Sequence, residues 1–248
     1  MANDNKNTRK GTFMNSSKSK ALLNKYLPIT LNFLIFIFSA VGFFLSCYFA
    51  RRDGYYHWLT RLLYFTQLSN LWIGITSLIF AIILLKKNVT QKTYNIFSLL
   101  KYIFTVSITI TGVIFCSFLA PFADFNVWSF ASVLTHVVVP VLSIVDFFTN
   151  KSIVKIDKKF VWYTIIPPII YFIFTSVLCV LKVDFGRGDP YPYFFMNYYS
   201  EVGLFGFIAK WPPQIGSFYW FVFFFAFIYG LSILYYKIHS LILNRKKQ

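Results

Sequence analysis

Long apolar blocks alternate with short polar connections along most of the chain. Six blocks are each long enough to cross a hydrocarbon layer, which takes about 20 helical residues. They cover residues 27–50, 62–85, 96–118, 127–148, 160–181 and 218–243. The apolar runs are continuous rather than alternating, and each is about twice as long as a strand of a membrane barrel. We therefore expect an all-α, polytopic membrane protein, built as a six-transmembrane-helix bundle.

The composition agrees with this fold class. Of the 248 residues, 57% are hydrophobic, 22% aromatic and only 13% charged, which lies far from the average of soluble proteins. Because most connections are short, consecutive helices should be antiparallel neighbours. We expect a six-helix transmembrane domain over residues 27–243. A polar, basic tail without stable structure (1–26) precedes it, and a short basic tail (244–248) follows.

The formal net charge of +16 predicts a topology rather than a nucleic-acid partner. Eighteen of the 24 basic residues fall on alternating connections of one side, which the positive-inside rule makes cytoplasmic. They are Lys6, Arg9, Lys10, Lys18, Lys20, Lys25, Lys86, Lys87, Lys92, Lys101, Lys151, Lys155, Lys158, Lys159, Lys237, Arg245, Lys246 and Lys247. We expect a multi-pass protein of the cytoplasmic membrane, with both termini cytoplasmic.

The connection over residues 182–217 is the longest on the other side. It combines chain-breaking and aromatic residues, as in Tyr191-Pro192-Tyr193 and Trp211-Pro212-Pro213. Such a segment is too apolar to extend into water. We expect it either to cap the outer mouth of the bundle or to lie as an aromatic belt in the headgroup layer.

Polar side chains inside the spans follow helical faces. On the fourth block they are Ser129, Ser132, His136, Ser143 and Asp146, with Pro140 on the same face, and on the second Thr66, Asn70 and Ser77. Steps of three and four residues place each set on one side of its helix. Hydroxyls and amides in such stripes often only bond neighbouring helices together.

Of the residues in these stripes, Thr66 and His136 are the two that could take part in catalysis. A hydroxyl and an imidazole on neighbouring membrane helices could form a nucleophile and a general base shielded from water. No third residue for a triad is evident, because Asp146 lies ten residues along the helix, about 15 Å from His136. The sequence contains no phosphate-binding loop, dinucleotide fingerprint or metal-ligand spacing, so neither a cofactor nor a metal is expected.

Three short motifs carry a resemblance to a known family. Phe65-Thr66-Gln67-Leu68-Ser69-Asn70, Leu134-Thr135-His136-Val137-Val138-Val139-Pro140 and Tyr191-Pro192-Tyr193-Phe194-Phe195 stand in sequence order along the chain. With these motifs the chain resembles the prokaryotic six-transmembrane branch of the androgen-induced-gene (FAR-17a-like) membrane proteins, over most of its spans. Animal members of that family include threonine hydrolases that cleave fatty acid esters of hydroxy fatty acids.

The resemblance implies an intramembrane hydrolase of fatty acyl esters, with Thr66 as the nucleophile and His136 as the base. Asn70 is a candidate oxyanion donor or orienting group, although an interhelical amide bond would also explain it. Ser69 is the rival nucleophile. Tyr191, Pro192 and Tyr193 are the candidate cap. The partners implied are membrane lipids and an acyl-ester substrate, with no nucleic acid and no known protein partner.

Helix geometry sets a condition on the catalytic pair. If the two helices begin at residues 62 and 127, Thr66 lies about 6 Å deep and His136 about 14 Å deep, and they do not meet. Starting the second helix near His57 moves Thr66 to about 13 Å and restores contact. The sequence permits this longer helix without requiring it.

Two other classes of function remain open. A transporter or small-solute channel would use the polar stripes to line a path, but the sequence shows no paired intramembrane charges and no broken helices in corresponding halves. A non-catalytic membrane scaffold would use the same stripes for packing alone. The bias toward Lys, Asn, Ile and Phe is typical of an A/T-rich bacterial genome.

Overall fold

The computed structural model describes residues 4–122, 127–186, 188–209 and 214–245. Its helices are α1 (Asp4–Tyr48), α2 (Phe65–Leu85), α3 (Gln91–Ile114), α4 (Phe130–Val133), α5 (Val139–Thr149), α6 (Ile166–Val180) and α7 (Ser217–Arg245). Short 3-10 or π segments are η1 (Trp58–Leu63), η2 (Phe115–Leu119), η3 (Ala120–Phe122), η4 (Leu134–Val138), η5 (Lys158–Ile165) and η6 (Phe194–Met196). The strands β1 (Phe207–Ile208) and β2 (Gln214–Ile215) pair antiparallel.

Six helical stretches in the described part of the chain are long and apolar enough to cross a membrane. They are Leu22–Tyr48, Phe65–Leu85, Gln91–Leu119, Phe130–Thr149, Lys158–Val180 and Ser217–Arg245. The prediction of an all-α, six-span, multi-pass membrane protein is therefore confirmed. The spans lie within a few residues of the predicted blocks, because length and continuous hydropathy fix them.

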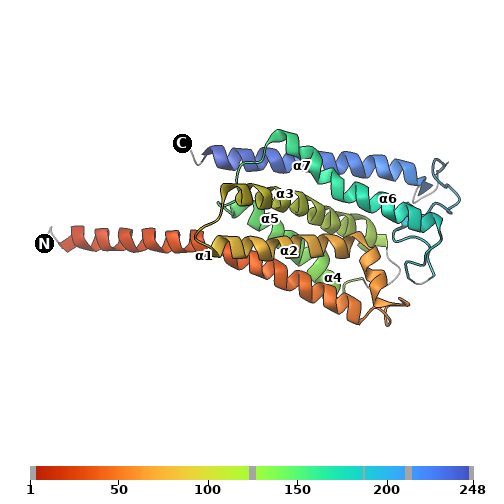
Figure 1. The fold of residues 1–248 in the computed structure, drawn as a ribbon, viewed down its shortest axis with the longest axis horizontal. Helices are drawn as coiled ribbons and strands as arrows, with labels where there is room; N and C mark the ends of the chain where they lie inside the picture. Colours follow the sequence, from red (N-terminus) through yellow and green to blue (C-terminus); the bar gives the residue numbers. More distant parts are fainter. Residues whose placement is uncertain (1–3, 123–126, 187, 210–213, 246–248) are drawn as a thin grey trace.

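The helices run back and forth, so the connections divide between two ends of the bundle (Figure 1). The ends of α1 and α7 nearest the termini lie at the same end as the α2–α3 and α5–η5 connections. The described residues of 182–216, which we call the cap segment, lie at the opposite end. The N-terminal part of α1 projects beyond the bundle and takes in residues 4–26, which the sequence predicts to lack structure.

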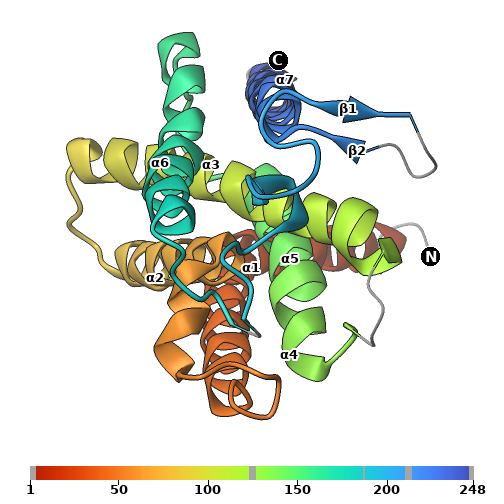
Figure 2. The same cartoon turned by 90° about the vertical axis from the view of Figure 1, so that its right-hand side faces the viewer.

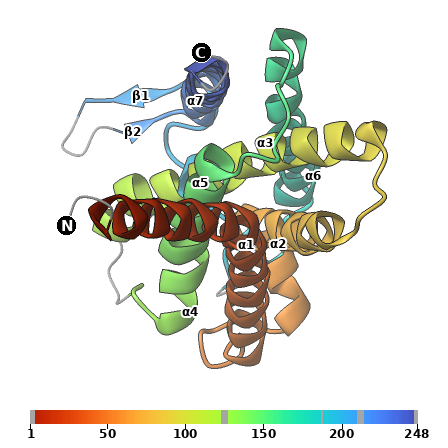
Figure 3. The same ribbon diagram turned by 90° about the vertical axis from the view of Figure 1, so that its left-hand side faces the viewer.

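Helix α3 forms the centre of the bundle. It packs against α2, α5, α7 and η5, as the two end-on views show (Figures 2 and 3). In its most apolar stretch 61% of the residues are buried, compared with 22% in the spans of α6 and of α7. The outer faces of α6 and α7 are therefore the surfaces offered to lipid.

The fourth span is interrupted by a π-helical turn, η4, between α4 and α5. Pro140 explains this turn, because proline lacks an N–H and its ring clashes with the carbonyl four residues earlier, which is that of His136. The N–H of Val139 bonds instead to the carbonyl of Leu134, five residues back. One extra residue is thereby accommodated in the turn that carries the histidine.

Gly112 lets α3 approach this turn closely. A Cβ atom placed on Gly112 would lie 2.8 Å from the carbonyl oxygen of His136 and 3.2 Å from the ring of Pro140. Any larger residue would force the two helices apart. The position of His136 therefore depends on the absence of a side chain on α3.

A buried ion pair joins α3 to α5 and corrects two expectations from the sequence. Lys101 Nζ lies 2.7 Å from Asp146 Oδ2, and both side chains are fully buried. Asn32 of α1 donates to Asp146 Oδ1 at 2.8 Å and accepts from Lys101 at 2.9 Å, while Ser77 of α2 accepts from Lys101 at 3.0 Å. Lys101 is therefore no part of a connection, and paired charges do occur within the spans. The helix begins at Gln91, which places Lys101 about three turns inside it.

The cap segment folds back onto the bundle. Phe185, Phe195 and Met196 are buried against Cys179 of α6 and Phe224 of α7. Residues 187 and 210–213 of the segment, including the Trp211-Pro212-Pro213 motif, lie outside the described residues, as do residues 246–248 of the expected basic tail. The aromatic residues of the segment thus provide packing surface for the bundle end.

Candidate functional site

Thr66 occupies the first turn of α2. The chain is extended at Tyr64, the N-cap residue, and Thr66 follows as the second residue of the helix with 8% of its surface exposed. The first-turn N–H groups of Phe65 and Thr66 have no acceptor within the helix. They also carry the positive end of the helix dipole, so this turn favours developing negative charge.

His136 lies in the π-helical turn η4 with its ring stacked on Phe115, at 3.7 Å between ring centroids. Its Nδ1 atom lies 2.9 Å from the backbone oxygen of Ser132. The hydroxyls of Ser132 and Thr135 also lie 3.1 and 3.2 Å from Nδ1, but the carbonyl is the nearest partner and can only accept, so we assign the proton to Nδ1. Nε2 of the neutral ring is then the basic nitrogen, which is the tautomer that a general base requires.

Thr66 and His136 line the same cavity, which we call the polar cavity, with a volume of about 760 Å³. It lies at the end of the bundle that carries the cap segment, and polar groups from several elements form its wall. They are Ser46, Arg52, Asp53, Tyr55, Arg61, Tyr64, Thr66, Gln67, Ser129, Ser132, Thr135, His136 and Tyr193. Both sequence-predicted catalytic residues thus face one space.

No hydrogen bond between Thr66 and His136 is found among the described residues. Helix α2 begins at Phe65, and His57 instead caps the short 3-10 helix η1. The longer second helix considered from the sequence is therefore not formed. The two residues reach the same cavity although Thr66 is the second residue of its span and His136 the seventh.

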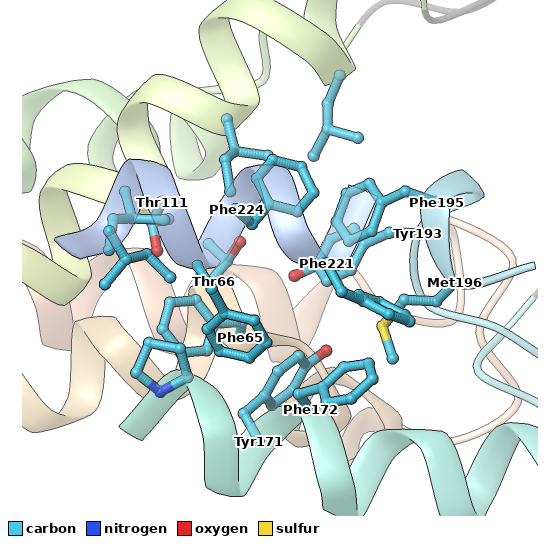
Figure 4. Close-up of a pocket in the computed structure, with 16 residues that line it drawn as sticks. Phe65, Thr66, Thr111, Tyr171, Phe172, Tyr193, Phe195, Met196, Phe221 and Phe224 are labelled. Atoms are coloured by element: carbon cyan, nitrogen blue, oxygen red, sulfur yellow. The ribbon is translucent and has the colours of Figure 1, made fainter. Parts of the chain in front are cut away.

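A second, apolar cavity of about 90 Å³ adjoins Thr66 on its other side (Figure 4). Phenylalanines and aliphatic residues of α3, α6 and α7 form most of its wall, with Phe195 and Met196 from the cap segment. Thr66, Leu119 and Tyr193 belong to the walls of both cavities. Thr66 therefore stands at the boundary between an apolar and a polar compartment.

Tyr193 of the cap segment reaches Thr66. Its hydroxyl lies within reach of a hydrogen bond to the side chains of Thr66 and Tyr171 and to the backbone of Phe65 and Thr66, and it points toward Thr66 in Figure 4. Burial raises the pKa of Tyr193 above its ordinary value, so the hydroxyl keeps its proton at neutral pH. Of the predicted cap residues, Pro192 also lines the polar cavity, whereas Tyr191 lines neither cavity.

Asn70 and Ser69 have other partners. Asn70 Nδ2 donates to the backbone oxygens of Thr66, at 2.8 Å, and Thr135, at 3.1 Å. Both amide hydrogens are thus engaged, so Asn70 joins α2 to η4 instead of offering a free donor. Ser69 is fully buried, bonds to Thr111 Oγ1 at 2.8 Å and lines neither cavity. Thr66 is therefore the accessible hydroxyl of the two candidate nucleophiles.

Charged groups stand in the wall of the polar cavity. Arg61 Nη2 lies 2.6 Å from Asp53 Oδ2, and its guanidinium stacks on Tyr55 at 3.8 Å from the ring centroid. Arg52 contacts the same carboxylate at 3.4 Å. Two guanidiniums thus share one carboxylate, which makes this wall hydrophilic.

Sequence reasoning missed Gln67 and Tyr171. Gln67 directly follows Thr66 and is buried in the polar cavity wall, while Tyr171 of α6 donates to the backbone oxygen of Leu63 at 3.1 Å. Neither belongs to a polar stripe, so no periodicity marked them. In the described ranges, no three His, Cys, Asp or Glu side chains are grouped so that they could hold a metal ion.

Comparison with known proteins adds no further constraint, since no protein family, curated protein or solved structure matches the chain.

Proposed function

We propose that this protein is an intramembrane hydrolase of fatty acyl esters. The observation that carries the proposal is the position of Thr66 on the shared wall of an apolar and a polar cavity, with His136 in the polar one. An acyl chain suits the apolar cavity, and the ester carbonyl would then lie beside Thr66. The resemblance of the Thr66 and His136 motifs to the FAR-17a-like threonine hydrolases supports the same roles.

The chemistry follows from the two side chains. Nε2 of His136 takes the proton of Thr66 Oγ1 as that oxygen attacks the ester carbonyl carbon. The carbon–oxygen bond to the alcohol breaks, and the alcohol leaves with the proton from Nε2. Water then attacks the acyl-threonine, gives a proton to Nε2 and releases the fatty acid, while Thr66 regains its proton from the imidazole. Thr66 Oγ1 must turn toward His136 for the first step, because catalytic hydrogen bonds often tighten only in the complex with substrate.

The oxyanion would be stabilised by the start of α2. The N–H groups of Phe65 and Thr66 and the hydroxyl of Tyr193 lie together there. Donors arranged in advance around a developing negative charge typically contribute about 2.7 to 4 kcal/mol each in other acyl-transfer enzymes. These groups replace Asn70 in the role considered from the sequence.

Covalent labelling tests the nucleophile. Purified protein in detergent would be treated with a fluorophosphonate probe, and the adduct mapped by mass spectrometry in the wild type and in Thr66→Ala, His136→Ala and Ser69→Ala. We expect an adduct on Thr66 that is lost in Thr66→Ala, strongly reduced in His136→Ala and retained in Ser69→Ala. An adduct on Ser69, or no adduct on a folded wild type, would refute the proposal.

We place the protein in the cytoplasmic membrane of a bacterium, with both termini cytoplasmic and the site near the outer surface. The basic residues of the α2–α3 and α5–η5 connections support this orientation. In a cysteine-free background, an impermeant maleimide should label Tyr56→Cys in intact cells and Lys87→Cys only after permeabilisation. The reverse pattern would invert the topology.

A small-solute transporter is the second candidate. The buried pair of Lys101 and Asp146 favours it, because charged pairs inside a membrane often mark a path. Neither cavity reaches the pair, however. Solute flux into proteoliposomes that is lost in Asp146→Asn but unchanged in Thr66→Ala would support transport over hydrolysis.

A further inference from the structure

Gln67 is a buried carboxamide without a protein partner for its oxygen. The residue is 5% exposed, and its Oε1 atom accepts no hydrogen bond among the described residues. Asn70 Oδ1 is likewise without a partner, but Asn70 lines neither cavity, whereas Gln67 lines the polar cavity. Buried amide oxygens in native proteins are rarely left in this state, and each such case needs an explanation, such as a bound water or ion or a role at an active site.

The side chain of Gln67 belongs to the wall of the polar cavity and directly follows the proposed nucleophile. A carboxamide offers both an acceptor and a donor, which matches a hydroxyl group on a ligand. Ser129 and Ser132 on the opposite helix add further hydroxyls to this wall. The cavity is thus equipped to bind a molecule that carries several hydroxyl groups.

The two cavities would hold the two halves of an ester separately, the acyl chain in one and the alcohol in the other. The apolar cavity of about 90 Å³ has room for about three water-sized groups, at about 30 Å³ each, which fits the first carbons of an acyl chain next to the ester carbonyl. An alcohol half in the polar cavity would instead meet Gln67 and the pair of Arg61 and Asp53. A second hydrocarbon chain in that space would cover these groups without bonding to them, and such burial is costly.

We propose that the substrate is an acyl ester of a polyol, such as glycerol or a sugar, and that Gln67 binds a free hydroxyl of the alcohol half. This inference rests on the proposed function, since it assigns the leaving group of the same reaction. Gln67 is then a specificity-determining residue. Its effect falls on the choice of alcohol and leaves the chemistry at Thr66 unchanged.

Three octanoyl esters of matched acyl chain test the inference: 1-octanoylglycerol, propyl octanoate and the octanoyl ester of a hydroxy fatty acid. We expect the wild type to have a kcat/KM for 1-octanoylglycerol about tenfold or more above those for the other two. Gln67→Leu should lose most of this preference, because its kcat/KM falls more for 1-octanoylglycerol than for propyl octanoate. Gln91→Leu, which changes an exposed glutamine at the start of α3, serves as the matched control and should keep the preference.

The outcomes separate this inference from the proposed function. Cleavage of all three esters with equal efficiency, or a preference for the ester of the hydroxy fatty acid, would overturn the polyol assignment and leave the hydrolase intact. If the wild type cleaves no ester, polyol recognition is tested by binding instead. Binding of the ether 1-O-octylglycerol is then measured by tryptophan fluorescence. Weaker binding to Gln67→Leu than to the wild type and Gln91→Leu would support polyol recognition. Equal binding to all three proteins would refute the assignment of a polyol ester.

Discussion

Lys101 and Asp146 form an ion pair between α3 and α5, with 2.7 Å between nitrogen and oxygen and no exposed surface on either side chain. Two further polar side chains, of Asn32 and Ser77, bond to the pair from α1 and α2. Four helices therefore converge on one charged cluster inside the bundle. An arrangement that separated the pair would leave a buried charge without a partner, which is costly.

Removal of one partner of this pair should be far more damaging than removal of both. Lys101→Met leaves a buried carboxylate without its cation, and we expect a loss of about 3–5 kcal/mol in the free energy of unfolding. Lys101→Met combined with Asp146→Leu should lose much less than the two single changes added together. Denaturant titration in detergent measures these values, with the exposed Lys151→Met as the control. Additive losses would show that the pair is not coupled.

The close approach at Gly112 predicts sensitivity to a single methyl group. In Gly112→Ala the new Cβ would meet the carbonyl oxygen of His136, so we expect a loss of about 1–3 kcal/mol in stability and reduced ester cleavage. Gly230→Ala provides the comparison, because a Cβ there has no neighbour within 4 Å. That change should be neutral or stabilise α7 by up to about 1 kcal/mol. Equal thermal stability of the two variants would contradict the packing described here.

Tyr193 should affect turnover more than stability. Tyr193→Phe removes the hydroxyl that reaches Thr66, and we expect kcat to fall by about 100- to 1000-fold, as for the loss of one oxyanion donor. Tyr191→Phe is the matched control, because Tyr191 bonds to Asp189 and lines neither cavity. Steady-state kinetics on one ester give both values. An unchanged kcat in Tyr193→Phe would show that Tyr193 contributes only to packing.

The size of the apolar cavity should set the length of the acyl chain. Ile114 lines it from the end of α3, so Ile114→Phe would fill part of the space and shift the preferred chain toward fewer carbons. Ile75→Phe adds the same bulk on a lipid-facing position that is 52% exposed, and it should leave the preference unchanged. Cleavage rates over a series from butyryl to dodecanoyl esters measure the shift. An unchanged profile in Ile114→Phe would place the acyl chain elsewhere.

The spans could be predicted because each is a continuous apolar run of sufficient length, and no tertiary contact is needed to recognise such a run. The start of α2 was harder to predict. Residues 58–63 are as apolar as a helix start, but they form a 3-10 turn and the chain is extended at Tyr64. Lys101 was assigned to a connection because lysine usually marks one, whereas its partner Asp146 lies 45 residues further along the chain.

The candidate site was predictable in part. Thr66 and His136 line one cavity, and the polar stripes correctly placed them on inward faces. That they catalyse a reaction remains a prediction. Gln67 could not be connected to the site from sequence, and Tyr193 was predicted only as part of the cap, because their positions in the wall depend on which residues stand opposite across the cavity. The engagement of Asn70 by two backbone oxygens was likewise invisible, since backbone acceptors leave no trace in the residue pattern.

The extra residue in the π-helical turn rotates the α4 part of the fourth span relative to α5. Each residue of an α-helix turns the chain by about 100°, so a regular helix through residues 134–138 would point the imidazole of His136 in another direction relative to α5. Deleting Val137 should therefore turn the α4 end of the span away from α3 while α5 keeps its packing. The direction of the imidazole is thus set by Pro140, a residue that lines neither cavity.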